Sequence, residues 1–214
     1  MPGRFIVIEG IDGCGSTTQV KRLGARLAAR GVPSHVTCEP STGPIGRLIR
    51  SALQRRIDRG DAPGVGFTAE TLALLFAADR LDHVAVEIEP ELAQGNVVIS
   101  DRYDLSSLAY QSATASSGAS GLVWLRELNR CARRPDLTLV IDVRAETAER
   151  RRAARGGPPE LFEQNELQRR LAALYLEAER LVPGDVLLHI DGEGSEDEVA
   201  ERIERAVQPL LGTD

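Results

Sequence analysis

A chain of 214 residues, of which 42% are hydrophobic, is long enough for one α/β domain with a substantial core. Its net charge of −6 argues against a general nucleic-acid-binding surface, and its three scattered cysteines indicate neither a disulfide framework nor a zinc site. Because no apolar run approaches the length of a membrane span and no signal-like segment precedes the first apolar run, we expect a cytoplasmic protein without membrane association.

The first predicted elements are a strand and a helix joined by a glycine-rich loop. Residues 5–9 form an apolar run typical of a buried parallel strand, and residues 18–30 carry apolar side chains at helical spacing. The loop, residues 10–17, matches the phosphate-binding pattern G-x-x-x-x-G-K-[ST], except that Ser16 replaces the lysine. Such a loop binds phosphate largely through backbone N–H groups and the helix N-terminus. The replacement therefore removes one fixed positive charge and keeps most of the site.

This loop predicts a site for the phosphates of ATP, with Mg²⁺ beside the Thr17 hydroxyl. The residues that we expect to contact the phosphates are Gly10, Gly13, Gly15, Ser16, Thr17 and Thr18.

Further apolar runs alternate with helical stretches along the rest of the chain. They lie at residues 34–38, 96–101, 136–143 and 186–191. This alternation indicates a parallel sheet that is covered on both faces. The predicted fold class is α/β: a P-loop NTPase fold with a doubly wound, five-stranded parallel sheet, forming one domain over residues 1–214. Segments rich in glycine, at residues 60–66, 115–121 and 155–159, are expected to be flexible connections.

A long helical stretch, residues 68–92, precedes the strand that ends at Asp101. An aspartate that closes a parallel strand lies at the carboxyl edge of the sheet, where open α/β folds bind their ligands. The loop after the first strand lies at the same edge. Asp101 and the phosphate-binding loop are therefore expected to be neighbours.

Four separated segments of this chain, in this order, resemble thymidylate kinases. They are residues 8–13 (Ile-Glu-Gly-Ile-Asp-Gly), Glu39-Pro40, residues 75–80 (Leu-Phe-Ala-Ala-Asp-Arg), and Asp101-Arg102-Tyr103 followed by residues 106–111 (Ser-Ser-Leu-Ala-Tyr-Gln). Several motifs in register are more specific than the loop alone, which indicates only a superfamily. The resemblance implies transfer of the γ-phosphoryl group of ATP to dTMP with Mg²⁺. It also implies a homodimer, to which the helix around Leu72, Leu75 and Val84 would contribute unless those residues belong to the core.

The resemblance assigns the acceptor nucleotide to these segments. Phe76 would stack on the thymine ring, Arg80 would reach the base, and Arg102 would hold the 5′-phosphate. Tyr110 would lie against the sugar and favour deoxyribose. Taken by itself, Phe76 is typical of a core residue and Arg80 of an exposed helix face. The full set implied for dTMP is Glu39, Arg50, Phe76, Arg80, Arg102, Ser107, Tyr110 and Gln111.

The same resemblance places Asp12 near the sugar 3′-hydroxyl and the reacting phosphates, and Asp101 near Mg²⁺, directly or through water. Residues 148–164 resemble the mobile lid of bacterial members, and their arginines would supply the charge that Ser16 lacks. An exposed face of a basic helix is the alternative for this arginine run. The implied catalytic residues are Asp12, Arg102, Arg151 and Arg155, and the metal residues are Thr17 and Asp101.

The missing lysine leaves two other interpretations open. One is a nucleotide-binding protein that has lost turnover, and the other is a kinase for another deoxynucleotide. Phe76, Arg80, Arg102 and Tyr110 together favour an active thymidylate kinase, because a mere binder needs no complete acceptor set.

Overall fold

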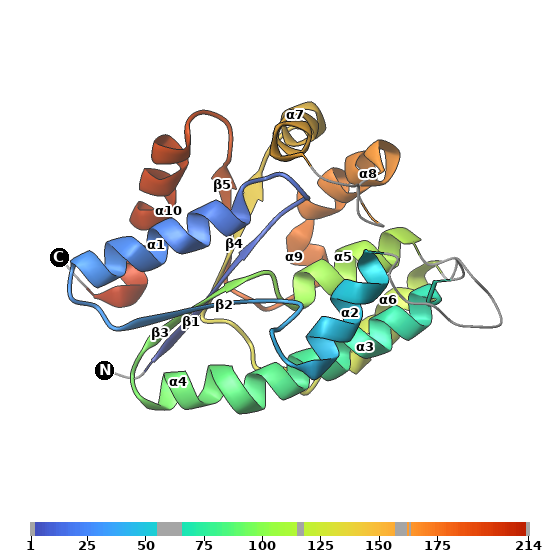
Figure 1. Ribbon diagram of the computed structural model, residues 1–214, viewed down its shortest axis with the longest axis horizontal. Helices are drawn as coiled ribbons and strands as arrows, with labels where there is room; N and C mark the ends of the chain where they lie inside the picture. The colour runs from blue at the N-terminus through green and yellow to red at the C-terminus, as the bar shows by residue number, and fades with distance from the viewer. Residues whose placement is uncertain (1–2, 55–65, 115–117, 157–161, 163, 213–214) are drawn as a thin grey trace.

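A central parallel sheet with helices on both sides organises this protein (Figure 1). The computed structural model describes residues 3–54, 66–114, 118–156, 162 and 164–212. The strand order is β2-β3-β1-β4-β5, and every neighbouring pair is parallel, which confirms the predicted sheet. The strands are β1 (Arg4–Glu9), β2 (Ser34–Cys38), β3 (Val97–Asp101), β4 (Leu137–Asp142) and β5 (Leu187–Asp191).

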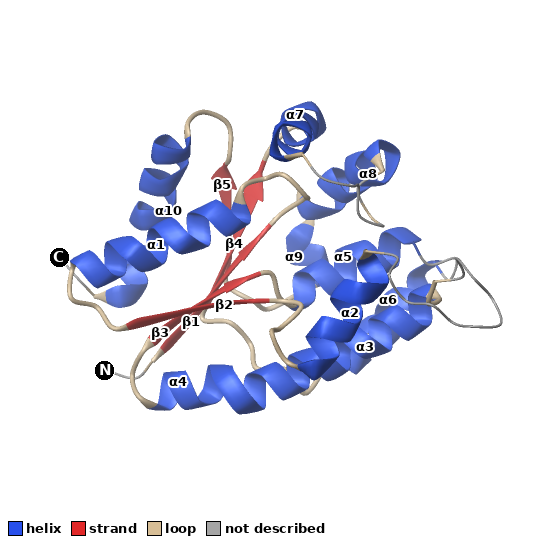
Figure 2. Cartoon of the chain, viewed as in Figure 1, coloured by secondary structure: helices blue, strands red, loops and turns tan. Residues whose placement is uncertain are grey.

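Alternating side chains of β1 enter the two layers of the core, as the two-residue period of a strand requires. Ile6 and Ile8 pack into the larger cluster, which α1 (Ser16–Ala29) and α10 (Glu196–Leu211) help to form. Phe5 and Val7 point to the opposite face and join a smaller cluster. Figure 2 shows the strands of the sheet with helices on either side. Burial on both faces explains why the strands are continuous apolar runs.

The helical stretch predicted over residues 68–92 is present as one rod of three consecutive elements. These are α3 (Ala69–His83), the π-helical turn η1 (Val84–Ile88) and α4 (Glu89–Ala93). Thr68 caps the start, because its side chain accepts a hydrogen bond from the backbone N–H of Thr71 at 3.2 Å. Phe76 and Arg80 therefore both lie on α3, upstream of the π turn.

The remaining helices are α2 (Pro44–Leu53), α5 (Asp104–Thr114), α6 (Gly118–Leu128), α7 (Ala145–Arg155), α8 (Asn165–Tyr175) and α9 (Ala178–Leu181). The expectation of a flexible connection over residues 115–121 is wrong from Gly118 onward, where α6 begins. Leu125 of α6 is buried in the core, and this packing outweighs the weak helix propensity of the glycines.

The other expected connections fall largely outside the described residues. Residues 60–65, 115–117 and 157–159 belong to the segments that the structure does not describe. Arg155 is the last residue of α7, and Gly156 follows it with a positive φ of 69°. None of the described helices is long and apolar enough to cross a membrane.

Candidate active site

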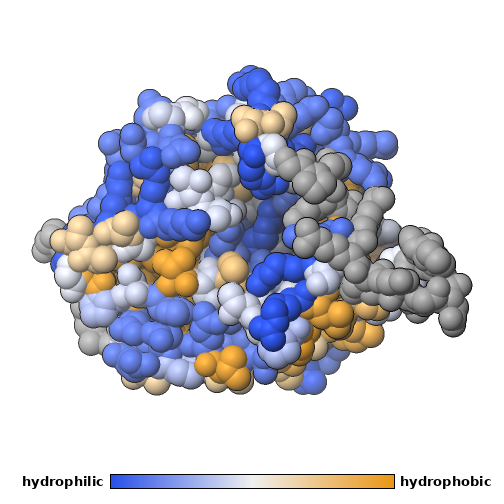
Figure 3. All heavy atoms as spheres, viewed as in Figure 1, coloured by the Kyte–Doolittle hydropathy of each residue, from blue (hydrophilic) through white to orange (hydrophobic). Residues whose placement is uncertain are grey.

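The phosphate-binding loop connects β1 to α1 at the carboxyl edge of the sheet. Gly10, Gly13 and Gly15 have φ values of 152°, 90° and 100°, a region that favours glycine. Space also requires glycine at the first position, because a Cβ on Gly10 would lie 2.8 Å from the Cys14 sulfur. Helix α1 begins at Ser16, so its first N–H groups face the loop. Figure 3 shows a hollow near the centre of the molecule, with hydrophilic residues along part of its wall.

Thr17 and Asp101 meet at this edge, as predicted for the two metal residues. The Thr17 hydroxyl donates to the Asp101 carboxylate at 2.5 Å. The other carboxylate oxygen, Oδ1, is buried and has no hydrogen-bond partner among the described residues. An unpartnered carboxylate oxygen beside a hydroxyl is the kind of hard oxygen pair that Mg²⁺ takes as ligands. These residues therefore fit the expected ion.

Three arginines of α7 line the cavity over the phosphate-binding loop, namely Arg151, Arg152 and Arg155. Arg151 donates to the carbonyl oxygens of Cys14 and Gly192, both at 3.0 Å. Arg152 donates to the carbonyl oxygen of Asp12 at 2.6 Å. Sequence reasoning selected Arg151 and Arg155 from this run and missed Arg152. The run itself was the signal, but only the docking of the helix shows which arginines face the loop.

Gly13 allows this docking of α7 on the loop. A Cβ at Gly13 would lie 2.5 Å from the carbonyl oxygen of Ala148 and 3.0 Å from the side chain of Arg152. A larger residue would therefore push α7 away from the loop. Because Gly13 has no side chain, the arginines of α7 lie close to the loop, in which Ser16 replaces the lysine of the pattern.

Arg102 joins the loop to the turn after β3. Its guanidinium donates to the carbonyl oxygen of Gly10 at 3.0 Å, to Ser106 Oγ at 3.0 Å and to Asp12 Oδ1 at 2.7 Å. Among the described residues other than glycine, it is the one with a positive φ, 73°. A left-handed conformation at a non-glycine residue costs free energy and is often retained at functional sites. The predicted catalytic residues Asp12 and Arg102 are thus in direct contact.

Gln168 of α8 holds Asp12 from the other side and was missed by sequence reasoning. It is fully buried, and its Oε1 accepts from the backbone N–H of Asp12 at 3.1 Å. Its Nε2 donates to Asp12 Oδ2 and to the carbonyl oxygen of Phe162, both at 2.8 Å. No sequence pattern marks a buried glutamine on an amphipathic helix as a site residue, because its hydrogen-bond partners come from distant segments of the chain.

A second cavity, of about 130 Å³, lies beside Asp12 and Arg102. Arg50 is absent from its described lining, because its guanidinium donates to the carbonyl oxygens of Pro40 and Ser41 and so supports the loop after β2. The other residues predicted for the acceptor all line it: Glu39, Phe76, Arg80, Arg102, Ser107, Tyr110 and Gln111.

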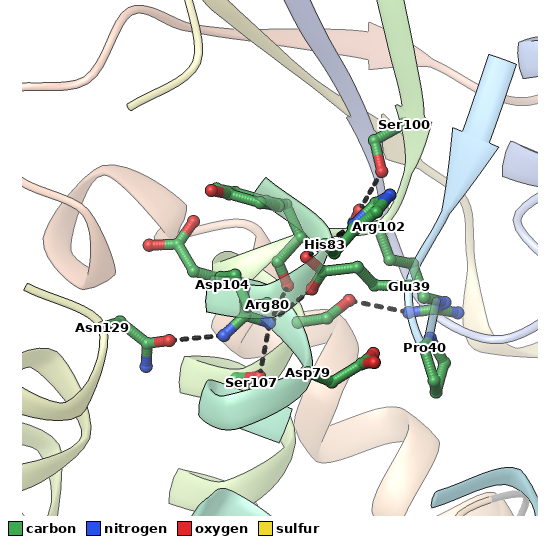
Figure 4. A network of polar contacts seen from close by, with 12 residues as sticks. Glu39, Pro40, Asp79, Arg80, His83, Ser100, Arg102, Asp104, Ser107 and Asn129 are labelled. Atoms are coloured by element: carbon green, nitrogen blue, oxygen red, sulfur yellow. Dashed lines mark hydrogen bonds and ion pairs between the residues drawn. The ribbon is translucent and has the colours of Figure 1, made fainter. Parts of the chain in front are cut away.

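Arg80 is the centre of a buried polar network on the floor of this cavity (Figure 4). It donates to Glu39 at 2.7 Å and to Ser107 Oγ at 2.9 Å, and it also binds Asn129. Its exposed fraction of 1% rules out the alternative of a solvated helix face. Arg80 Nε and Gln111 Oε1 are buried and have no hydrogen-bond partner within the described chain. A buried donor and a buried acceptor without protein partners remain available to water or to a polar ligand.

The aromatic residues complete the wall of the cavity. Phe76 is only partly buried and faces the cavity, so it is no core residue. The rings of Tyr110 and Phe162 meet edge to face with centroids 5.4 Å apart. Burial raises the pKa of Tyr110 far above its ordinary value, so its phenol remains neutral at physiological pH. The cavity thus offers flat apolar surfaces beside a few polar groups.

Known proteins resemble this chain over most of its length. The family model described as thymidylate kinase matches residues 8–203. The chain belongs to the thymidylate kinase family. A probable thymidylate kinase of Thermococcus gammatolerans is 42% identical over 181 residues, which are 85% of each chain. Residues 8–203, which the family model matches, contain every motif on which the resemblance was based.

Two further relatives of the thymidylate kinase family cover the chain to a similar or greater extent. A probable thymidylate kinase of Pyrococcus abyssi is 44% identical over 176 residues, 82% of each chain. A putative thymidylate kinase of Aeropyrum pernix is 38% identical over 216 residues, 95% of this chain and 97% of its own. The predicted family is therefore confirmed, and the resemblance of the lid to bacterial members stays a prediction.

We predict that Gln168→Leu lowers the free energy of unfolding by about 1–3 kcal/mol, because it leaves the N–H and carboxylate of Asp12 without their buried partner. Denaturant unfolding measures this change. The control is Gln94→Leu, an exposed glutamine that donates to the Pro90 carbonyl oxygen at 3.1 Å, which should cost no more than about 0.5 kcal/mol. Equal stability of the two variants would contradict the role assigned to Gln168.

Proposed function

We propose that this protein transfers the γ-phosphoryl group of ATP to dTMP, giving dTDP for dTTP synthesis. The observation that carries the proposal is that Asp12 and Arg102 line both cavities, the one over the phosphate-binding loop and the one proposed for the acceptor. Donor and acceptor phosphates would therefore meet beside these two side chains. Phosphoryl transfer requires alignment and charge compensation, and we propose no protein nucleophile.

The donor phosphates would bind to the backbone N–H groups at the start of α1. Thr17 and Asp101 would hold Mg²⁺, because the free Asp101 Oδ1 and the Thr17 hydroxyl lie beside that helix end. The ion supplies charge neutralisation for the phosphate oxygens when it is bound. Arg151, Arg152 and Arg155 would add the positive charge that Ser16 does not provide.

The acceptor would lie in the second cavity, with its base toward Arg80. Pyrimidine bases carry both carbonyl oxygens and N–H groups, and the unpartnered Arg80 Nε and Gln111 Oε1 offer one donor and one acceptor. Phe76 would contact the face of the ring, and Tyr110 the sugar. Arg102 would bind the 5′-phosphate. Arg50 would act on this phosphate indirectly, through the Pro40 and Ser41 carbonyls that it holds.

Residues 148–164 are proposed to act as a lid within a single domain over residues 1–214. The described part of that segment supports this, because α7 contacts the phosphate-binding loop and Gln168 binds Phe162. The expected cytoplasmic location stays a prediction.

The purified protein should form ADP when ATP, Mg²⁺ and dTMP are all present. In a coupled assay with dTMP, dUMP, dCMP, thymidine and UMP, we expect the highest kcat/KM for dTMP. Thymidine should react poorly because it lacks the phosphate proposed to bind Arg102, and UMP because its 2′-hydroxyl would meet Tyr110. Binding of ATP and dTMP without ADP formation would favour the non-catalytic interpretation. A higher kcat/KM for another nucleotide would show that dTMP is not the preferred acceptor.

The arginines of α7 should replace the missing lysine. We expect Arg152→Ala to lower kcat on the order of 10²-fold with little change in dTMP affinity, because such charges act mainly on the transition state. Arg151→Ala and Arg155→Ala test the other two positions. Arg150→Ala is the control, because Arg150 donates to Thr147 at 3.1 Å and is not among the described residues that line the cavity.

The reciprocal variant Ser16→Lys should give little gain in the natural background and a clear gain in the Arg152→Ala background. A large gain from Ser16→Lys alone, with no effect of any arginine substitution, would contradict the compensation.

We also propose a homodimer that forms through α3 and α6. These helices contact each other and carry the exposed apolar side chains Leu74, Leu81, Val123 and Trp124. Leu72, which the sequence suggested for this contact, is 3% exposed and belongs to the core. The available surface is therefore the other side of the same helix.

Light scattering should give twice the chain mass of 23.2 kDa for the natural protein. Val123→Glu should reduce it to one chain mass, because a charge at this exposed position would be buried in the contact. Val86→Glu is the matched control, since Val86 is equally exposed, at 66%, on the neighbouring η1 turn. Dimers in both variants would contradict the proposed face.

A further inference from the structure

Glu9, the last residue of β1, is completely buried, and none of the assigned roles uses its carboxylate. Its Oε1 accepts from the backbone N–H groups of Tyr103 at 2.8 Å and Ser106 at 3.1 Å. Its Oε2 accepts from the hydroxyls of Ser106 at 2.6 Å and Tyr175 at 3.1 Å. The carboxylate therefore binds the turn after β3, the start of α5 and the end of α8.

The hydroxyl of Ser106 connects this carboxylate to Arg102. It donates its single proton to Glu9, so its oxygen lone pairs remain for other groups. Arg102 Nη1 donates to that oxygen at 3.0 Å. Because the hydrogen bond to an anion is the strongest available to the hydroxyl, the charge on Glu9 determines in which direction the Ser106 proton points.

We propose that Glu9 is a positioning residue for the acceptor-phosphate site, and that its carboxylate orients Ser106 so that the hydroxyl oxygen accepts from Arg102. Glu9 also holds the backbone just beyond Arg102, whose φ of 73° needs support from its surroundings. This inference rests on the proposed function, in which Arg102 binds the phosphate of dTMP.

Burial raises the pKa of Glu9 to about 7, although Arg102 and the hydrogen bonds of Ser106 and Tyr103 act to lower it. The other ionisable group that contacts it is the Tyr175 phenol, whose pKa burial raises well above its ordinary value. Arg102 is itself paired with Asp12. A protonated Glu9 no longer needs the Ser106 proton. That proton is then free to turn to the Tyr175 hydroxyl, 3.0 Å away, and the protonated carboxyl can donate to the Ser106 oxygen in competition with Arg102.

The sign of the pH dependence follows. The folded-state pKa lies above the ordinary carboxyl value of 4.5, so the stability that Glu9 contributes is fully present below about pH 4.5 and is lost as the pH rises to about 7. The ionised form of Glu9 is nevertheless the one that orients the Ser106 hydroxyl. The affinity for dTMP should therefore rise with pH through about 7, while the stability contributed by this residue falls.

Glu9→Gln separates these two effects. A glutamine Oε1 can accept from both backbone N–H groups, and its Nε2 can donate to both hydroxyls, so the variant retains hydrogen-bonded partners without the charge. At about pH 8.5 we expect dTMP binding to weaken about tenfold, with ATP affinity unchanged and stability equal to or above that of the natural protein.

Isothermal titration with dTMP from about pH 5.5 to 8.5 provides the decisive comparison. The titration of the dTMP phosphate affects the natural protein and Glu9→Gln alike. The ratio of their dissociation constants for dTMP therefore isolates the effect of ionisation of Glu9. This ratio should fall toward one as the pH decreases. A ratio independent of pH, or a loss of ATP and dTMP affinity together with reduced stability, would overturn the proposal.

Ser106→Ala tests the same connection without altering Glu9. It should weaken dTMP binding about as much as Glu9→Gln, and the double variant should lose little more, because both remove one link. Ser34→Ala, at the opposite end of the sheet, is the control and should bind dTMP normally. Additive losses would overturn the link through Ser106. If the natural protein fails to bind dTMP at every pH, the proposed function itself is wrong, which is a different result.

Discussion

The ion pair between Asp12 and Arg102 is the interaction on which the site depends. It joins the phosphate-binding loop to the turn after β3 at 2.7 Å, and both side chains face both cavities. Parallel pairing of β1 with β3 brings the two loops to the same edge, because Ile8 lies beside Asp101 in the register. The fold thus places an anion, a cation and a helix N-terminus where two groups of phosphates would approach each other.

Several ionisable groups of this site are buried at a cost in stability. Arg80 and Glu39 pair at 2.7 Å with side chains only 1% and 3% exposed, and Glu9 has no exposure at all. Buried ion pairs contribute little net stability, because desolvation offsets their attraction. Their extensive hydrogen bonding instead fixes side-chain orientation, so we interpret them as groups that organise the site. Arg80 Nε, Gln111 Oε1 and Asp101 Oδ1, which have no hydrogen-bond partner among the described residues, fit this interpretation.

The loss of the loop lysine has a structural counterpart elsewhere in the chain. Gly13 lets α7 approach the loop so closely that Arg152 binds the carbonyl oxygen of Asp12. Sequence reasoning expected compensation from this arginine run but selected Arg151 and Arg155. Helical spacing places residues on faces, but the rotation of a helix about its axis depends on the packing beneath it. Arg50 binds the backbone carbonyls of Pro40 and Ser41, so its role at the acceptor phosphate stays a prediction.

The sequence by itself determined the family, the order of the strands along the chain and seven of the residues that line the second cavity. Those features are local: apolar runs, glycines with special φ values, and motifs whose spacing is fixed by one element each. Tertiary structure alone decided the roles of Glu9, Gln168 and Arg152, and the helix beginning at Gly118. Each of these depends on hydrogen bonds or packing between segments distant in the chain. Their energies come from burial, which no local pattern records.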